Sequence, residues 1–134
     1  MKASIMSKLL ITLGVVFYLI VIPMLEWNNS HVFNAEWPPH ARFHEVWQLV
    51  TNMLLGVFVL WLAWFRSQIT TSAIISSAIM GGVIISHLLS SYIGGSVQSG
   101  NITKHVLGLD LAVFVALFVI LLSGIAALIK KSDK

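Results

Sequence analysis

The sequence contains no cysteine, which excludes disulfide bonds, thiolate metal sites and dithiol redox chemistry. Charged residues are also scarce, because only 10% of the 134 residues are Asp, Glu, Lys or Arg. Soluble domains usually carry about 25% charged residues, so this composition argues against a soluble protein. The net charge of +3 is spread over the ends of apolar segments, so no nucleic-acid partner is expected.

Apolar residues fill the chain instead. They make up 57% of it, and the mean hydropathy is +0.91. Runs at 9–25, 47–65 and 106–129 approach or exceed the length of about 18 residues that marks a membrane-spanning helix. A fourth run, 69–93, is diluted by serines, whose hydroxyls can bond to their own helix backbone. These runs predict an integral, multi-pass membrane protein whose surroundings are the lipid bilayer.

The predicted fold is all-α, a four-transmembrane-helix bundle in a single membrane domain, 1–134. The helices are expected at about 8–25, 41–65, 69–93 and 105–129, with outer loops at 26–40 and 94–104. The first run could instead be a signal peptide, because Lys2 and Lys8 precede it. Its length and the lack of an Ala-x-Ala-like site after it favour a retained helix.

Basic residues predict the orientation in the membrane. Most of them fall at one set of helix ends: Lys2, Lys8, Arg66, Lys130, Lys131 and Lys134. The opposite ends carry only Arg42 and Lys104. The positive-inside rule therefore places both termini on the cytoplasmic side and the two outer loops on the other side. The predicted location is a bacterial inner membrane, with the outer loops facing the periplasm.

This topology gathers all five histidines in the outer half of the protein: His31, His40, His44, His87 and His105. Pro38 and Pro39 favour a helix start, because proline is well accommodated in the first turn of a helix. His40 and His44 then lie one turn apart on one helix face, where two imidazoles can bind one cation.

Two ionisable residues are predicted to lie below the outer surface. His87 precedes the end of its helix by six residues, which corresponds to a depth of about 9 Å. Asp110 lies five residues beyond His105, at a depth of about 7 to 9 Å. We therefore expect His87 and Asp110 to be partners, either in a structural hydrogen bond or in a functional site. In a functional site, Asp110 would bind a metal or orient a liganding histidine.

Residues 31–48 read HVFNAEWPPHARFHEVWQ and resemble a motif of small, multi-helix integral membrane proteins of bacteria and fungi. The matching positions are His31, Asn34, Trp37, Pro38, Pro39, His40, Ala41, Arg42, Phe43 and His44. Ala35 stands where the motif has proline. The resemblance covers about one seventh of the chain. It implies a four-helix membrane fold without an established reaction, and it implies that His31, His40 and His44 belong to one constellation. A looser, fold-level similarity of size and layout links the chain to sterol-isomerase and sigma-2 type four-helix membrane proteins.

The leading functional hypothesis is a membrane metalloprotein, an oxidoreductase that uses an iron or copper site on a lipophilic substrate. Imidazole-rich sites without thiolates suit iron, copper or zinc, so zinc also fits. The predicted ligands are His40, His44, His87 and His105. The candidate catalytic residues are His87, Asp110 and Glu45, and further polar candidates are His31, Glu36 and Glu26.

Two other functions stay open at this point. The first is a metal-free lipid or terpenoid isomerase or cyclase, in which histidine and carboxyl groups move protons. The second is a non-catalytic accessory subunit of a larger membrane complex. A homo-oligomer is compatible with each of the three functions.

Overall fold

The structure, a computed structural model, describes residues 3–98 and 104–132. In these residues the elements are α1 (Ile5–Val16), η1 (Phe17–Val21), α2 (Ile22–Glu26), α3 (Pro39–Trp64), α4 (Ile69–Ile93), β1 (His105–Val106), β2 (Leu109–Asp110) and α5 (Leu111–Ser132). The segments α1, η1 and α2 form one continuous span. Together with α3, α4 and α5 they give four helical spans long and apolar enough to cross a membrane, which confirms the predicted number.

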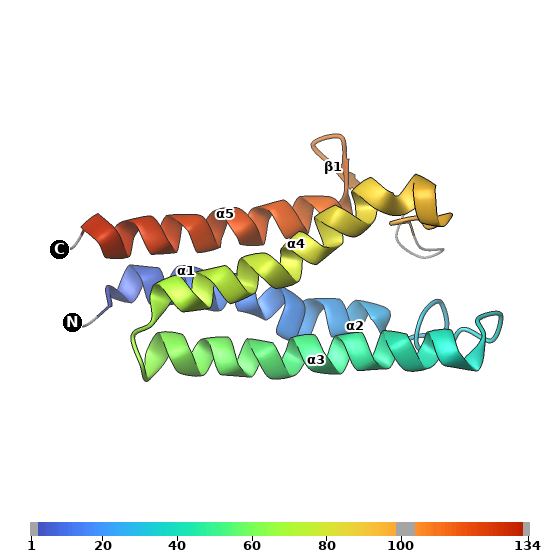
Figure 1. The fold of residues 1–134 in the computed structure, drawn as a ribbon, viewed down its shortest axis with the longest axis horizontal. Helices are drawn as coiled ribbons and strands as arrows, with labels where there is room; N and C mark the ends of the chain where they lie inside the picture. Colours follow the sequence, from blue (N-terminus) through green and yellow to red (C-terminus); the bar gives the residue numbers. More distant parts are fainter. Residues whose placement is uncertain (1–2, 99–103, 133–134) are drawn as a thin grey trace.

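The spans form a bundle in which the start of α1 and the end of α5 lie at the same end (Figure 1). α4 packs against α5 along much of its length and crosses the first span, while α3 packs against α1, η1 and α4. The start of α3, the end of α4 and the β1–β2 hairpin lie at the opposite end. This second end, called the loop end below, holds the candidate functional residues.

A π-helical segment interrupts the first span just before Pro23. Proline has no N–H to donate to the carbonyl of Leu19, and its ring crowds the preceding turn, so the wider π turn accommodates both effects. Tyr18, within this segment, is fully buried, and its hydroxyl lies 2.9 Å from Oγ of Ser76 on α4. The hydrogen bond therefore links the first span to α4 in the core.

Small residues bring the spans close together. A Cβ added at Gly14 would lie 3.2 Å from Cγ1 of Val119, and one at Gly56 would lie 3.1 Å from the Tyr18 ring. The fully packed core contains Ile11, Val15, Tyr18, Val59, Ala63, Ile69, Ala73, Met80, Ala116, Val119 and Ala126. Many large apolar side chains face outward on all four spans, among them Leu54, Ile85 and Leu128. Such a surface is typical of a protein surrounded by lipid.

The five tryptophans lie at the two ends of the spans, with Trp27, Trp37 and Trp47 at the loop end and Trp61 and Trp64 at the other. Nζ of Lys8 donates a hydrogen bond to the carbonyl oxygen of Trp64 and lies 5.5 Å from its ring centre. Arg66 lies at the same distance from the Trp61 ring. Trp47 and Trp64 are 17 positions apart along the helix, which corresponds to about 25 Å, close to the hydrocarbon thickness of a bilayer. This is the pattern expected of two interfacial belts.

The last span begins at Leu111 rather than at His105. Residues 105–110 form a hairpin instead, in which His105 pairs with Asp110 and Val106 with Leu109. The turn residues Leu107 and Gly108 have φ angles of 52° and 81°, which are typical of a two-residue hairpin turn. α3 begins at Pro39, two residues earlier than predicted. Part of the predicted loop 94–104 lies outside the described residues.

Candidate functional site

The histidines lie toward the loop end but in separate surroundings. Among residues 3–98 and 104–132, no group of three or more His, Cys, Asp or Glu side chains is placed to hold a metal ion. His87 lines a cleft, His105 lies in the hairpin, and His40 and His44 lie together on α3. The four predicted ligands do not meet in this arrangement, so a site that contains all of them stays a prediction.

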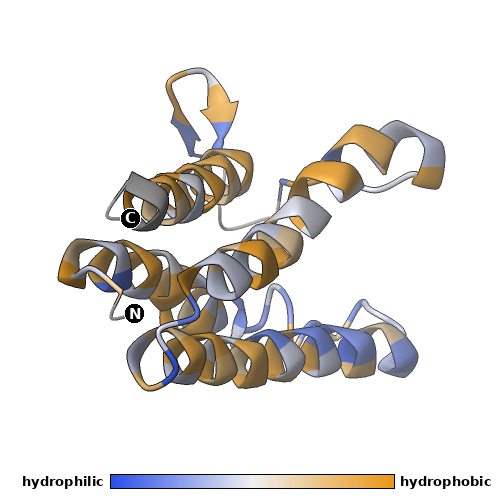
Figure 2. Cartoon of the chain, turned by 60° about the vertical axis from the view of Figure 1, so that its left-hand side comes forward, coloured by the Kyte–Doolittle hydropathy of each residue, from blue (hydrophilic) through white to orange (hydrophobic). Residues whose placement is uncertain are grey.

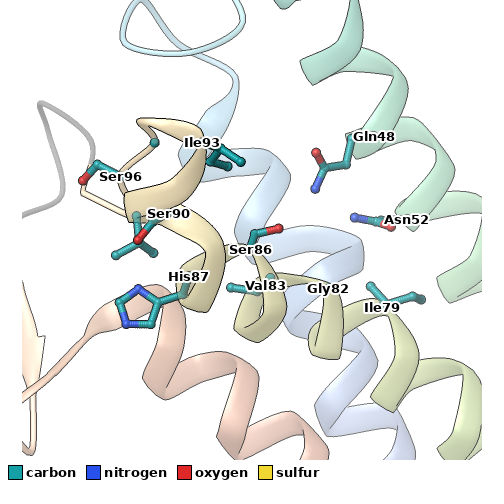
Figure 3. A pocket seen from close by; sticks show the side chains of 12 residues that line it. Gln48, Asn52, Ile79, Gly82, Val83, Ser86, His87, Ser90, Ile93 and Ser96 are labelled. Carbon is teal, nitrogen blue, oxygen red and sulfur yellow. The ribbon is translucent and has the colours of Figure 1, made fainter.

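A cleft of about 400 Å³ lies between α3 and α4. Figure 3 shows the cleft and the side chains around it. It is lined by Gln48, Asn52, Ile79, Gly82, Val83, Ser86, His87, Ser90, Ile93, Gly95, Ser96 and Val97. Its volume falls in the usual range for small-molecule sites, about 300–1,000 Å³. The cleft is therefore large enough to take a small lipophilic molecule.

The α3 wall of the cleft carries two amide side chains. Gln48 and Asn52 are four residues apart, so they lie one above the other on the same helix face. Both amides point toward α4, where Ser86 faces them (Figure 3). Glu45 precedes Gln48 by three residues and continues this polar stripe toward the loop end. Figure 2 shows the same trend, because α3 is hydrophilic near Pro39 and hydrophobic over the rest of its length.

His87 lies on the flank of α4 that is turned away from Gln48 and Asn52 (Figure 3). Because His87 and Ser90 also line the cleft, the cleft extends round this part of α4. The His87 Nδ1 atom is buried and has no hydrogen-bond partner among the described residues. A buried polar atom without a partner is costly, so Nδ1 of His87 is a group that a bound molecule could satisfy.

Asp110 does not pair with His87, contrary to the expected partnership. Its Oδ1 atom lies 3.1 Å from Nε2 of His105 and accepts a hydrogen bond of 3.3 Å from Gln98. The register of the hairpin places His105 directly opposite Asp110. The His105 side chain is 50% exposed, so this contact belongs to the surface of the loop end rather than to the cleft.

A second polar cluster joins α2, the following loop and α3. Nε2 of His31 lies 2.7 Å from Oε2 of Glu26, and the two side chains are only 12% and 21% exposed. Oε2 of Glu26 is buried without an aligned hydrogen bond among the described residues, and the imidazole nitrogen of His31 is its close polar neighbour. Glu45 interacts electrostatically with both Glu26 and His31. This Glu26–His31–Glu45 cluster therefore connects α2, the following loop and α3 at the loop end.

The loop before α3 orients His31 in this cluster. Nδ1 of His31 lies 2.8 Å from the hydroxyl of Ser30, and the ring meets Trp37 edge to face at 5.7 Å. Asn34 fixes the turn, because its side chain donates to the Ser30 carbonyl and accepts from the backbone of Glu36. Glu36 itself is exposed and lies outside the cluster.

His40 and His44 form a pair on the exposed side of α3. Their Nε2 atoms lie 3.0 Å apart, and their rings meet at 84° with centres 4.4 Å apart. No hydrogen bond or ring contact joins His31 to either of them among the described residues. The expected constellation of three histidines therefore stays a prediction, because His31 lies with Glu26 and Trp37 before α3 while His40 and His44 contact each other on α3.

The predicted site residues did not include the amides and hydroxyls of the cleft. Gln48 and Asn52 interrupt an apolar run at a spacing of four, and Ser86 and Ser90 repeat this spacing on α4. That shared spacing is the sequence signal for two polar faces. Whether the two faces meet depends on how α3 and α4 cross, which the spacing does not specify.

No protein-family model, curated protein or solved structure matches this chain. The similarity of residues 31–48 to a motif of small membrane proteins therefore stays a prediction, as does the looser similarity to sterol-isomerase and sigma-2 type proteins. The chemistry of the cleft and of the neighbouring clusters is the basis on which a function can be argued.

Proposed function

We propose that this protein is a multi-pass membrane enzyme that isomerises or cyclises a neutral lipophilic molecule by proton transfer in the cleft between α3 and α4. The observation that carries the proposal is the lining of this cleft. Among the described residues, amides, hydroxyls and one imidazole face a space of about 400 Å³ between two helices long and apolar enough to span a membrane. Intramembrane polar residues of this kind usually mark a path or site for a substrate.

The lining supports a substrate with a neutral polar group. None of the described residues that line the cleft is Lys, Arg, Asp or Glu. Amide and hydroxyl side chains both donate and accept hydrogen bonds, which suits a hydroxyl or carbonyl group better than a phosphate. Ile79, Val83 and Ile93 supply the apolar contacts for the body of the molecule. The expected substrate is therefore an uncharged lipid or terpenoid alcohol or ketone.

His87 is the expected acid–base group, because it is the titratable side chain among the described residues that line the cleft. Its imidazole lines the cleft and can both accept and donate a proton, which is the chemistry that an isomerisation needs. Glu45 continues the stripe of Gln48 and Asn52, so the Glu26–His31–Glu45 cluster can connect the cleft to protons at the surface. Gln48 and Asn52 lie on the other flank of α4 from His87, so in this proposal they hold a polar group of the substrate that is remote from the carbon at which His87 exchanges the proton.

The proposal includes an orientation in the membrane. Lys8 and Arg66 contact tryptophans at the end opposite the cleft, and the positive-inside rule assigns that end to the cytoplasm. The cleft then opens in the outer leaflet, which is the periplasmic side if the membrane is a bacterial inner membrane. A lipophilic substrate would enter from the bilayer between α3 and α4.

Photolabelling tests the binding part of the proposal. The probes are a diazirine-bearing cholesterol and a diazirine-bearing hexadecanol, offered to the purified full-length protein in phosphatidylcholine nanodiscs. A Cβ added at Gly82 or at Gly81 meets no atom within 4 Å, but only Gly82 lines the cleft. Gly82→Phe should reduce labelling by at least one probe, and Gly81→Phe should leave it unchanged. Equal labelling of both variants and the wild type would contradict the proposal.

Deuterium incorporation tests the proton-transfer part. The protein is incubated in D₂O with the lipid extract of the cells that produce it, and mass spectrometry finds the lipids that gain deuterium at carbon. A lipid should gain deuterium with the wild type but not with His87→Gln, which retains a polar side chain of similar reach. If no lipid gains deuterium above the protein-free control, the acid–base function is wrong and the cleft is a binding site only.

The metal-dependent oxidoreductase stays a prediction with less geometric support. Such a site needs its nitrogen ligands within about 2.0–2.1 Å of one ion. Among the described residues, His105 pairs with Asp110, and His87 lines the cleft on another element from His40 and His44. A common iron or copper site would therefore require a rearrangement of the loop end.

A further inference from the structure

The pair His40 and His44 has the geometry of a chelating site. The two Nε2 atoms lie 3.0 Å apart and face each other one helical turn apart. Two imidazole nitrogens bound at about 2.0–2.1 Å to one tetrahedral or octahedral ion are themselves about 2.9–3.4 Å apart. The observed separation lies within this range. Small rotations of the two side chains would direct both lone pairs at one ion.

The local backbone fixes this arrangement. Pro38 precedes the helix with φ −54° and ψ 145°, and Pro39 is the first helical residue. His40 and His44 therefore lie in the first two turns, on a regular helix that holds their spacing at one turn. Because the two Nε2 atoms share a single hydrogen bond, a cation can replace the shared proton without breaking other contacts of these atoms.

The surroundings favour a borderline divalent metal ion with water as its other ligands. Both side chains are exposed. Among the described residues, no third histidine and no carboxyl group is placed to bind the same ion. Imidazole ligands suit copper, nickel and zinc, whereas magnesium and calcium prefer oxygen ligands. The usual order of affinity places Cu²⁺ above both Ni²⁺ and Zn²⁺.

We propose that His40 and His44 together bind one divalent transition-metal ion, with Cu²⁺ bound most tightly, at the start of α3. This site is separate from the proposed substrate cleft, because neither histidine lines that cleft. The two proposals can therefore fail independently.

Trp47 provides a reporter for the site. Its ring centre lies 5.5 Å from that of His44, on the next turn of α3. Bound Cu²⁺ quenches the fluorescence of an indole at such a short distance. Trp47→Phe should remove most of the quenched emission without changing Cu²⁺ binding itself.

The experiment titrates Cu²⁺, Ni²⁺ and Zn²⁺ into the full-length protein, purified without a histidine tag, and follows fluorescence and the electron paramagnetic resonance of Cu²⁺. His40→Ala and His44→Ala should each weaken Cu²⁺ binding at least about tenfold, because chelation by two linked ligands is lost. His105→Ala is the matched control, since its side chain is half exposed in the hairpin. This variant should bind Cu²⁺ as the wild type does.

Thermal unfolding gives a second measurement that does not depend on fluorescence. An ion that binds only the folded protein raises its melting temperature. Saturating Cu²⁺ should raise the melting temperature of the wild type and of His105→Ala, but not of His44→Ala. Equal Cu²⁺ affinity of wild type, His40→Ala and His44→Ala would overturn the proposal, as would a resonance spectrum without two nitrogen ligands.

Discussion

The contact between Glu26 and His31 leads to a prediction about stability. His31→Ala removes the imidazole that lies 2.7 Å from the buried Oε2 of Glu26. The helix α2 is followed by the loop that carries His31, and the same imidazole contacts Trp37 before α3 begins. The substitution therefore weakens the connection between the first two spans at the loop end.

The expected loss of stability has two parts. A buried polar group left without its partner costs about 1–3 kcal/mol. The edge-to-face contact of His31 with Trp37 contributes about 0.5–1.5 kcal/mol more. We expect His31→Ala to lower the free energy of unfolding by about 1.5–4.5 kcal/mol, the sum of these two ranges. Glu26→Gln should remove part of the same interaction, so the double variant should lose less than the two single variants together.

These differences in the free energy of unfolding can be measured by equilibrium unfolding in mild detergent micelles. SDS is the denaturant, and circular dichroism is the signal. His105→Ala is the matched control, because this imidazole also contacts a carboxylate, at 3.1 Å, but is 50% exposed. Exposed ion pairs contribute about 0–1 kcal/mol, so the control should be far milder. Additive effects of His31→Ala and Glu26→Gln, within about 0.5 kcal/mol, would refute the reasoning. A loss in His105→Ala as large as in His31→Ala would refute it too.

Three further predictions concern the core and the hairpin. Tyr18→Phe and Ser76→Ala should each reduce the free energy of unfolding by about 1 kcal/mol, with a coupling of about 0.6 kcal/mol in a double-mutant cycle, because they share one buried hydrogen bond. Gly56→Ala should lower the melting temperature because its Cβ would lie 3.1 Å from the Tyr18 ring, whereas Gly81→Ala should not lower it because its Cβ meets open space. Gly108→Ala should speed amide hydrogen exchange in the hairpin, because Gly108 has a φ of 81° that alanine rarely adopts.

The four spans could be predicted from the sequence because lipid-facing helices need long apolar runs regardless of their partners. The start of α3 was close to its predicted place because proline is compatible with the first turn of a helix and no later one. The side-by-side position of His40 and His44 followed from the helical repeat alone. These features depend on local chemistry, which a single sequence contains.

The partner of Asp110 could not be predicted in the same way. The expected pairing with His87 assumed that a helix runs without interruption from His105 to Asp110. Leu107 and Gly108 reverse the chain instead, and Leu-Gly is a weaker turn signal than Asn-Gly. The reversal places His105 opposite Asp110, which changes both the depth and the partner of the carboxylate.

The cleft depends on tertiary structure that no periodicity specifies. α4 runs at an angle to α3 and diverges from it toward the loop end (Figure 1), and Gln48 and Ser86 face each other across the cleft (Figure 3). The polar spacing on each helix is equally compatible with two polar faces that point away from each other.

The central claim is that a lipophilic molecule binds in the cleft between α3 and α4. The position at which a lipophilic probe attaches covalently tests this claim most directly. The diazirine-bearing cholesterol and hexadecanol are photolysed with the wild-type protein, and mass spectrometry of the digested protein identifies the labelled residues. The predicted result is labelling concentrated at residues 82–97, in α4 and the segment that follows it, and near Gln48 and Asn52. Labels spread equally over outward-facing positions such as Leu54 and Leu117 would contradict the proposed cleft site.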